Sequence, residues 1–284
     1  MTAIAVAPIT DAFIERDLAR IDEFRTEYRS RFADKPYFGP AHAATIAAIG
    51  ATALATYFTA LRKPLKTTEL AIVPATFLAC NLVEWAMHNY VMHVPRKGPL
   101  GAAMEIYTRH TLNHHQFFSR ERMTYDDVND YRIVFFPPVA LLSLIALSAG
   151  PAALLGKLFK SRNVGLLFMM TTTGMYLVYE TFHYCCHLED NSFLRHMPFI
   201  NTIRRHHAAH HDKRVMKERN MNLTFPIADW LFRTSDLDRG LIGHIFNGYD
   251  ETHVKPEFTA DGLRRQAVAA ANERAARAEM FMPA

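Results

Sequence analysis

The hydrophobic positions of this chain are gathered into long runs that are separated by polar stretches. Four runs stand out, at residues 43–61, 70–83, 133–156 and 164–179. The first and third contain no charged residue, and each is about as long as the roughly 20 helical residues that cross the core of a bilayer. The second and fourth reach that length only by continuing into a glutamate followed by histidines.

These runs predict an all-α integral membrane protein with a bundle of about four transmembrane helices. The alternative is a soluble protein with buried helices. Four such runs within about 140 residues exceed what the core of a small soluble domain needs.

The segments that flank the runs are polar and also read as helical. Residues 11–35 mix both signs of charge with apolar residues at three- and four-residue steps, which is typical of an amphipathic helix. That helix is expected either to lie on the membrane surface or to pack on the rest of the protein. Residues 262–280 are rich in alanine and predict a further helix, to which no chemistry is assigned.

The distribution of basic residues predicts the orientation of the chain in the membrane. Residues 93–132 carry six Lys or Arg and the tail after the fourth run is rich in both, whereas the connectors 62–66 and 157–162 carry three each. Basic loops favour the cytoplasmic side. The N-terminus, the central loop and the tail are therefore predicted to be cytoplasmic.

Composition narrows the class of protein further. Half of the residues are hydrophobic, the net charge is +4 and the pI is about 8.9. This mild basic excess suits contact with anionic headgroups, and it is too weak to indicate binding to nucleic acid. Three cysteines without a CxxC pattern indicate neither a disulfide framework nor a thiolate zinc site.

Histidine is the unusual component. Fifteen are present, and eleven fall into four tight groups: His88 and His93; His110, His114 and His115; His183 and His187; His206, His207, His210 and His211. Residues three or four apart share one face of a helix. That spacing holds for His110 with His114, for the third group, and for His207 with His210 and His211. Each of these groups is therefore expected to offer two or three imidazoles to one point.

The first group departs from that spacing. His88 and His93 are five residues apart, about 140° around a regular helix, so the helix must end or loosen between them if both bind one ion. Neutral imidazole is a common ligand of iron and zinc. A single ion takes about four to six ligands, so ten candidate histidines indicate two ions.

Two glutamates accompany these groups. Glu84 lies one turn before His88, and Glu180 lies three residues before His183. Their carboxylates are expected to accept the second ring N–H of a ligand and so fix its tautomer. The isolated histidines are interpreted as ordinary surface or core residues; they are His42, His196, His244 and His253.

At these residues the chain resembles the fatty acid hydroxylase superfamily, which also contains sterol desaturases and some carotenoid hydroxylases. The matching pieces cover residues 70–235 and are EWAMHNYVMH (84–93), RHTLNHH (109–115), RIVFFPPV (132–139), YETFHYCCH (179–187), RRHHAAHH (204–211) and NLTFPIADWLFRT (222–234). The pairing of the Pro-Pro segment with the second histidine group is most similar to the fatty acid 2-hydroxylase type.

The resemblance implies a four-helix membrane bundle under a cytoplasmic helical cap that carries a dinuclear metal site. Two iron ions are implied, and zinc can occupy such a site. The implied ligands are His88, His93, His110, His114, His115, His183, His187, His207, His210 and His211. His206 and Asp229 are expected, with Glu84 and Glu180, to support the ligands rather than to bind metal. The corresponding division is an amphipathic cytoplasmic segment (1–40), a membrane-embedded hydroxylase domain (41–250) and a cytoplasmic C-terminal helix (251–284).

Two departures from the family pattern stand out. Three residues separate His110 from His114, where the nearest hydroxylases usually have two, which bears on the role of His110. Arg233 stands in Phe-Arg-Thr where the family usually has Phe-Gly-Thr. The chain also contains no cytochrome b5 domain, so electrons are expected from a separate protein.

The expected function is an O2-dependent hydroxylation of a lipid acyl chain that enters from the bilayer. A sterol or carotenoid desaturase or hydroxylase of the same superfamily is the main alternative. A membrane zinc hydrolase would need a positioned base such as that of HExxH, which is absent. A non-catalytic carrier would spread its histidines along a membrane path. The expected location is the inner membrane of a bacterium or the endoplasmic reticulum of a eukaryote.

Overall fold

A computed structural model describes residues 8–95, 105–259, 261–263 and 265–266. Within these ranges the protein is built of helices, with two isolated β-bridges and no strand. The long helices are α1 (Pro8–Ser30), α2 (Gly39–Ala60), α4 (Ile72–Met87), α8 (Pro138–Leu158), α9 (Arg162–Cys186) and α11 (Pro198–His210). The short ones are α3 (Thr67–Leu70), η1 (His88–Met92), η2 (Thr108–His114), α6 (His115–Phe117), η3 (Val128–Asp130), α7 (Tyr131–Val134), α10 (Ser192–Arg195), α12 (Ile227–Leu231), α13 (Leu241–Ile245) and η4 (Pro256–Phe258).

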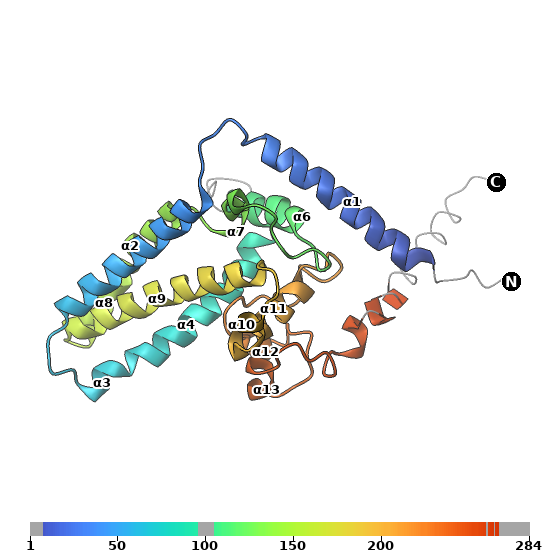
Figure 1. Ribbon diagram of the computed structural model, residues 1–284. Coiled ribbons are helices and arrows are strands. Elements are labelled where there is room, and N and C mark those ends of the chain that lie inside the picture. The colour runs from blue at the N-terminus through green and yellow to red at the C-terminus, as the bar shows by residue number, and fades with distance from the viewer. Residues whose placement is uncertain (1–7, 96–104, 260, 264, 267–284) are drawn as a thin grey trace, which may run out of the picture.

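Four long helices, α2, α4, α8 and α9, run side by side and form one arm of the molecule (Figure 1). Helix α9 is the central member, because it packs against α2, α4 and α8, whereas α4 and α8 are not in extended contact with each other. Gly165 permits a close approach of α9 to α8: a Cβ there would lie 2.5 Å from the Ala152 carbonyl oxygen. The bundle is therefore well packed around α9 and less closely packed between α4 and α8.

Three helical stretches are long and apolar enough to cross a membrane, namely Gly39–Ala60, Thr67–Met92 and Val128–Leu158. They coincide with the first three predicted runs. Large apolar side chains on their outer surface are exposed, including Leu147 and Leu158 on α8. An exposed apolar belt of this kind suits lipid rather than water. Helix α9 falls outside this set, although the fourth run is helical as predicted.

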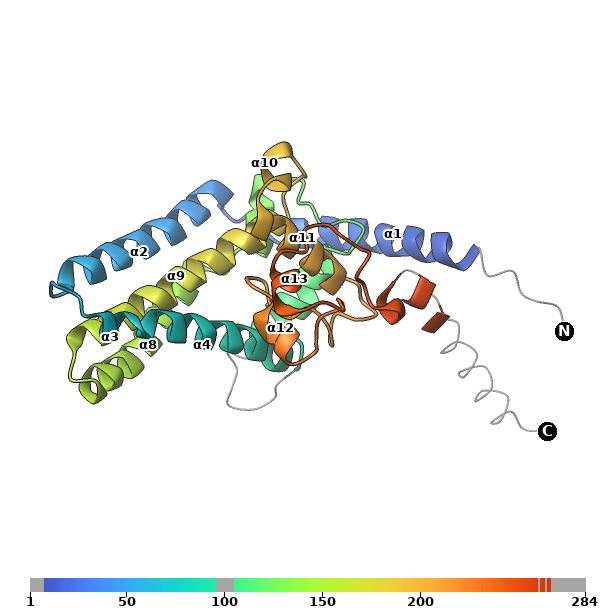
Figure 2. The ribbon, with the colours of Figure 1, turned by 90° about the horizontal axis from the view of Figure 1, so that it is seen from below.

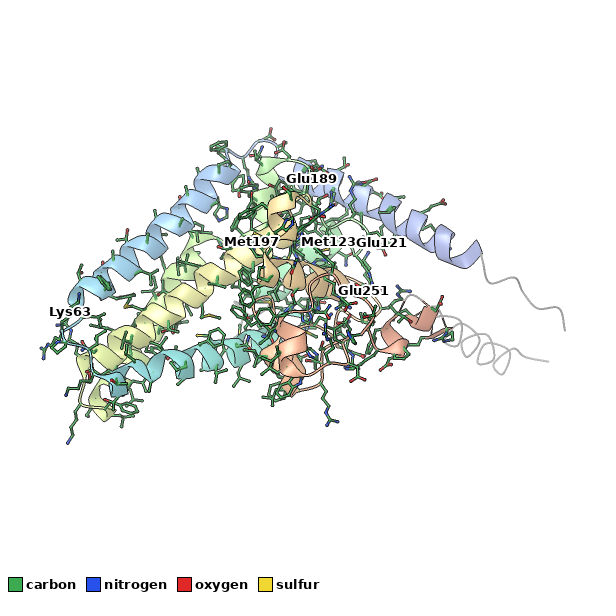
Figure 3. All side chains as sticks on the ribbon, turned by 60° about the horizontal axis from the view of Figure 1, so that its bottom comes forward. Lys63, Glu121, Met123, Glu189, Met197 and Glu251 are labelled. Carbon is green, nitrogen blue, oxygen red and sulfur yellow. The ribbon has the colours of Figure 1, made fainter. Side chains whose placement is uncertain are left out.

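The two basic connectors and the histidines lie at opposite ends of the bundle. The connectors meet each other, because Asn163 bonds both the backbone N–H and the carbonyl of Arg62, and its side chain also reaches Glu69. Figure 3 shows Lys63 at that end, and Met123 and Glu251 in the cap at the other. The cap consists of the short helices and loops around α11 (Figure 2).

Helix α1 packs on the protein through a buried arginine. Arg25 is 1% exposed; its Nε donates to the Phe117 carbonyl at 2.8 Å and its Nη2 to the Thr124 carbonyl at 2.9 Å, while Asp126 pairs with its Nη1 at 3.0 Å. The sequence predicts that residues 11–35 either lie on the membrane surface or pack on the rest of the protein. The contacts of Arg25 show that this helix packs on the protein. The helix ends earlier than predicted, at Ser30. Most of the predicted helix 262–280 lies outside the described residues.

The end of α12 explains the departure at Arg233. The Thr234 N–H donates to the Asp229 carbonyl and the Arg233 N–H to the Trp230 carbonyl, which is the hydrogen-bond pattern of a Schellman C-cap. This cap places Arg233 in the left-handed region, at φ 58°. Left-handed backbone is unfavourable for any residue with a Cβ and favours glycine. The glycine usual in the family thus suits the cap, and the arginine side chain is exposed.

Replacing Arg233 with glycine should stabilise the protein by about 1 kcal/mol, because it removes the cost of a Cβ in the left-handed region. In a thermal unfolding experiment in detergent, Arg233→Gly should melt about 2 °C above the wild type. Arg233→Ala is the matched control, because it removes the charge and keeps the Cβ. An equal gain in both variants would assign the effect to the side chain and contradict the backbone explanation.

Candidate metal centre

The structure brings ten of the grouped histidines into one buried cluster. Two sets of ring nitrogens each lie within 4.8 Å of one another. The five-histidine group is His88, His93, His110, His115 and His210, and the four-histidine group is His114, His183, His187 and His207. His211 lies between them: its Nε2 is 3.1 Å from the Nε2 atoms of His114 and His207, and its ring stacks on that of His115 with centroids 4.2 Å apart. All ten candidate ligands therefore meet, as two adjacent sets.

Two π-helices determine which histidines come together. Hydrogen bonds from i to i+5 widen the turn, so residues five apart share a face. In η1 this brings His88 and His93 into one group, as the predicted loosening of the helix requires. In η2 the Nε2 atoms of His110 and His115 lie 3.1 Å apart, and His114 turns to the other group.

This partition corrects two expectations. His110 and His114 do not point to one place, because η2 is a π-helix rather than a regular helix. The histidines of α11 also divide, with His207 in the four-histidine group and His210 in the five-histidine group. The third group behaves as a regular helical pair, with the Nε2 atoms of His183 and His187 3.3 Å apart, and so do His207 and His211 at 3.1 Å.

In five of these ten rings, the nitrogen that faces away from the cluster, Nδ1, is hydrogen-bonded to a backbone carbonyl. The Nδ1–H groups of the following residues donate to carbonyl oxygens: His88 to Met221 at 2.5 Å, His114 to Ile133 at 3.2 Å, His187 to Met123 at 2.7 Å, His210 to Arg219 at 2.7 Å and His211 to Phe118 at 3.3 Å. A carbonyl only accepts, so each of these Nδ1 atoms carries the proton. The Nε2 atom of each neutral ring then carries no proton, and its lone pair points into the cluster.

The lone pairs face one another without protons between them. His114 and His211 both donate through Nδ1, yet their Nε2 atoms are 3.1 Å apart. His93 and His210 repeat the arrangement at 3.1 Å, because the Thr111 hydroxyl donates to Met92 and can only accept from His93 Nδ1. Two lone pairs at this distance repel unless a cation lies between them. The donor set therefore fits cations, and an imidazole-only set suits iron or zinc.

Burial keeps these imidazoles neutral. Desolvation lowers the pKa of His93 to about 2 and, despite the bond to the Arg219 carbonyl, that of His210 to about 4. Burial, followed by neighbouring imidazoles, also lowers the pKa values of His110 and His115 far below the usual range. Neutral imidazole is the form that binds a metal.

A family model described as fatty acid hydroxylase matches residues 73–234. The chain belongs to the fatty acid hydroxylase family. The matched range contains all four histidine groups and the closing segment of α12. No curated protein and no solved structure matches the chain.

In this hydroxylase-family protein the glutamates support the centre differently from the prediction. Glu84 accepts the backbone N–H groups of Leu223 and Thr224, the latter at 2.9 Å, and the Thr224 hydroxyl at 2.6 Å. The expected acceptance of a ring N–H by Glu84 is therefore wrong for His88, whose Nδ1 donates to Met221 instead. Glu84 acts one step further away, because it holds the loop that supplies the Met221 carbonyl.

Glu180 and Asp229 also accept hydrogen bonds from backbone N–H groups. Glu180 accepts the Phe136 N–H at 3.3 Å, next to the segment whose Ile133 carbonyl receives His114. Asp229 accepts the N–H groups of Met221 and Asn222 at 2.9 and 2.7 Å, and His206 Nε2 at 3.0 Å. Burial alone would raise the pKa of Asp229, but the hydrogen bonds from His206 and its other donors lower it to about 2. His206 thus faces Asp229, in agreement with a supporting role.

Sequence reasoning missed an asparagine pair that completes this loop. Asn81 accepts the Ala228 N–H at 3.0 Å and donates to the Phe225 carbonyl at 2.7 Å, and Asn222 donates to the Asn81 carbonyl at 3.1 Å. Asn81 is 1% exposed and lies near the end of the second apolar run. A polar residue at membrane depth is a functional candidate by default, and that signal was available in the sequence.

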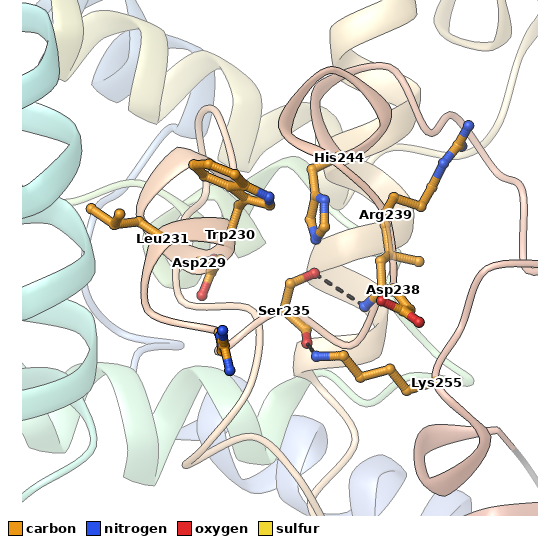
Figure 4. Close-up of a pocket in the computed structure, with 10 residues that line it drawn as sticks. Asp229, Trp230, Leu231, Ser235, Asp238, Arg239, His244 and Lys255 are labelled. Atoms are coloured by element: carbon orange, nitrogen blue, oxygen red, sulfur yellow. Dashed lines mark hydrogen bonds between the residues drawn. The ribbon is translucent and has the colours of Figure 1, made fainter.

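The isolated histidines remain outside the cluster. His42 contacts Tyr37 and the Phe136 carbonyl, and His244 donates to the Gly240 carbonyl at 3.2 Å. His244 instead lines a separate pocket of about 530 Å³ on the cap. Figure 4 shows it there beside Ser235, with Asp229 and Lys255 on the walls. Their interpretation as ordinary residues agrees with this placement.

An apolar cavity connects the bundle to the cluster. It has a volume of about 460 Å³ and is lined mainly by residues of α4, α8 and α9. Its end nearest the cap is formed by Glu84, His88, Met92, Phe136 and Tyr179. A ligand that fills this cavity therefore reaches the five-histidine group.

If the two groups hold separate ions, single substitutions should each remove about one of roughly two bound ions. His115→Ala should weaken metal binding at the five-histidine group alone and His187→Ala at the four-histidine group alone, so that each lowers the total metal by up to about one ion, measured by mass spectrometry on purified protein. His244→Ala, a buried histidine outside both groups, should keep the full content. Loss of all metal from either single variant would contradict two separable sites.

Glu84→Gln should weaken metal binding at the five-histidine group by roughly 10- to 100-fold, because a neutral amide oxygen holds the N–H groups of Leu223 and Thr224, and with them the loop behind His88, less strongly than a carboxylate does. The measurement is the metal retained during titration with a chelator. Glu69→Gln is the matched control, since Glu69 is a buried carboxylate at the opposite end that bonds Ser161 and Asn163. Equal effects of both variants would indicate a general loss of stability.

Proposed function

We propose that this protein is a membrane-bound, dinuclear-metal oxygenase that hydroxylates a lipid acyl chain with O2 and externally supplied electrons. The observation that carries the proposal is the apolar cavity, which runs between candidate membrane helices and ends at His88. Only an apolar molecule matches its walls along most of their length. Family membership and the two adjacent imidazole sets support the same reaction class.

We infer four membrane spans, with α9 as the fourth. Its 25 residues rise roughly 37 Å, which is enough to cross a bilayer core of about 30 Å. Contact with three neighbouring helices spares it from lipid, so it tolerates Glu180 and His183 near one end. With the basic central loop and tail inside, the cluster lies on the cytoplasmic side of a bacterial inner membrane or of the endoplasmic reticulum.

The substrate enters sideways from the bilayer. Helices α4 and α8 line the cavity together but are not in extended contact, so the passage between them is the natural entrance. The acyl chain then lies along α9 with one carbon beside His88, in a space lined by Met92, Phe136 and Tyr179. The protein thus positions the substrate and surrounds the reacting carbon with apolar side chains.

The ten clustered histidines are the proposed ligands, and iron is the proposed metal, with zinc able to bind the same set. When bound, the metal pair supplies the activation of O2 and the oxidising power that breaks a C–H bond. The Nδ1–H bonds to the carbonyls of Met221, Met123 and Arg219 keep the imidazoles fixed and neutral during turnover. Electrons come from a separate donor protein. Within the family, the fatty acid 2-hydroxylase type is the proposed subtype.

Lipid mass spectrometry tests this function. A host that expresses the wild-type protein should accumulate a lipid with one added oxygen, and a host that expresses His210→Ala should not, because His210 belongs to the five-histidine group. Loss of two hydrogens in place of added oxygen would assign the protein to the desaturases of the superfamily. No change that depends on the wild type, in a host supplied with an electron donor, would contradict the proposed activity.

A further inference from the structure

The end of the cavity far from the cluster carries hydroxyl groups. Thr76 comes from α4, Ser148 from α8 and Thr172 from α9, so three helices each contribute one to the same apolar space. The remaining walls there are apolar, with Phe168 and Leu144 among them. Hydroxyls from three helices at one depth are unexpected in a cavity that would hold only a hydrocarbon chain.

Two of these hydroxyls lack a hydrogen-bond partner among the described residues. Thr76 is 3% exposed, and the Oγ1 atoms of Thr76 and Thr172 are buried and unpaired. The Thr172 hydroxyl lies near the Cys80 thiol, but sulfur is a weak hydrogen-bond acceptor and satisfies the threonine O–H poorly. A buried hydroxyl without a partner is unfavourable, so it indicates a group that is supplied from outside the chain.

Other threonines of the bundle form a local hydrogen bond that Thr76 and Thr172 do not form. A threonine within a helix commonly donates to the carbonyl four residues earlier. Thr171, next to Thr172, donates in this way to Leu167 at 2.8 Å, and Thr45 and Thr56 do the same on α2, each at 2.7 Å. Thr76 and Thr172 leave that local bond unmade and line the cavity instead.

The hydroxyls are separated from the cluster by a defined length. Thr76 precedes His88 by twelve helical residues and Thr172 precedes His183 by eleven, which corresponds to roughly 18 and 16 Å along the bundle. A molecule that satisfies both ends is therefore elongated and apolar, with an oxygen atom at the end far from the histidines.

We propose that Thr76 and Thr172 bind a hydroxyl or carbonyl oxygen of an elongated apolar lipid whose opposite end lies at the five-histidine group. The inference rests on the proposed function, because it takes the cavity as the substrate site. It adds a substrate class: a lipid with an oxygen function within the membrane core, as distinct from a chain that ends in a methyl group. The two threonines bind this oxygen and so select which carbon reaches the cluster.

Equilibrium binding of two radiolabelled probes, 1-octadecanol and octadecane, to the full-length, metal-loaded protein in nanodiscs tests the proposal. The wild type should bind the alcohol about tenfold more tightly than the alkane, the effect of one or two additional hydrogen bonds. Thr76→Val combined with Thr172→Val should weaken binding of the alcohol to that of the alkane and leave alkane binding unchanged. Thr171→Val, whose hydroxyl already bonds Leu167, should retain the preference.

A ligand-side measurement covers the case in which the double variant does not fold. The methyl ether of octadecanol can accept but not donate, so the wild type should bind it with an affinity between those of the other two probes. Equal binding of all three probes, or binding of none, overturns the proposal, as does a preference that survives in a folded double variant. The assay needs neither electrons nor turnover, so a failure to detect lipid hydroxylation is a separate result.

Discussion

Hydrogen bonds from imidazole Nδ1 atoms to backbone carbonyls are the interaction on which the rest of this structure depends. They fix five rings as one tautomer and direct their Nε2 lone pairs into the cluster, for example at His88 and His187. Without a carbonyl acceptor, a buried neutral imidazole could turn its N–H inward and satisfy a neighbouring nitrogen. The carbonyl acceptors thus make the cluster electron-rich, which is the condition for holding cations.

Four of those five carbonyls belong to loops, and buried polar side chains hold these loops in place through hydrogen bonds. Glu84 reaches from a candidate membrane helix into the loop that supplies Met221, Asp229 holds the same loop from α12, and Arg25 holds the segment after the second histidine group from α1. A charge buried in this way is favourable only when its hydrogen-bonding capacity is filled. The helical bundle, the cap and α1 are therefore coupled through the histidine cluster.

Much of this arrangement could be predicted from the sequence, because apolar runs and histidine spacing are local patterns. The runs located α2, α4, α8 and α9, and spacing together with family resemblance named the ten histidines that meet; their role as ligands stays a prediction. The partition was wrong where regular helical periodicity was assumed. A π-helix pairs His110 with His115, and such a local insertion depends on tertiary packing rather than on composition. The loop partners of Glu84 were equally inaccessible, since they are about 140 residues away in sequence.

The π-helices also connect the cluster to the cavity. A regular helix through residues 88–93 would turn His93 about 140° from His88, so the two could not both join the five-histidine group beside the cavity. The wider turn of η1 keeps both in the five-histidine group, while Met92 still faces the cavity wall. Since π-helical turns are unfavourable and recur at functional sites, their presence in two of the four histidine segments indicates that the chain gives up helical regularity to bring ligands and an apolar binding space to one boundary.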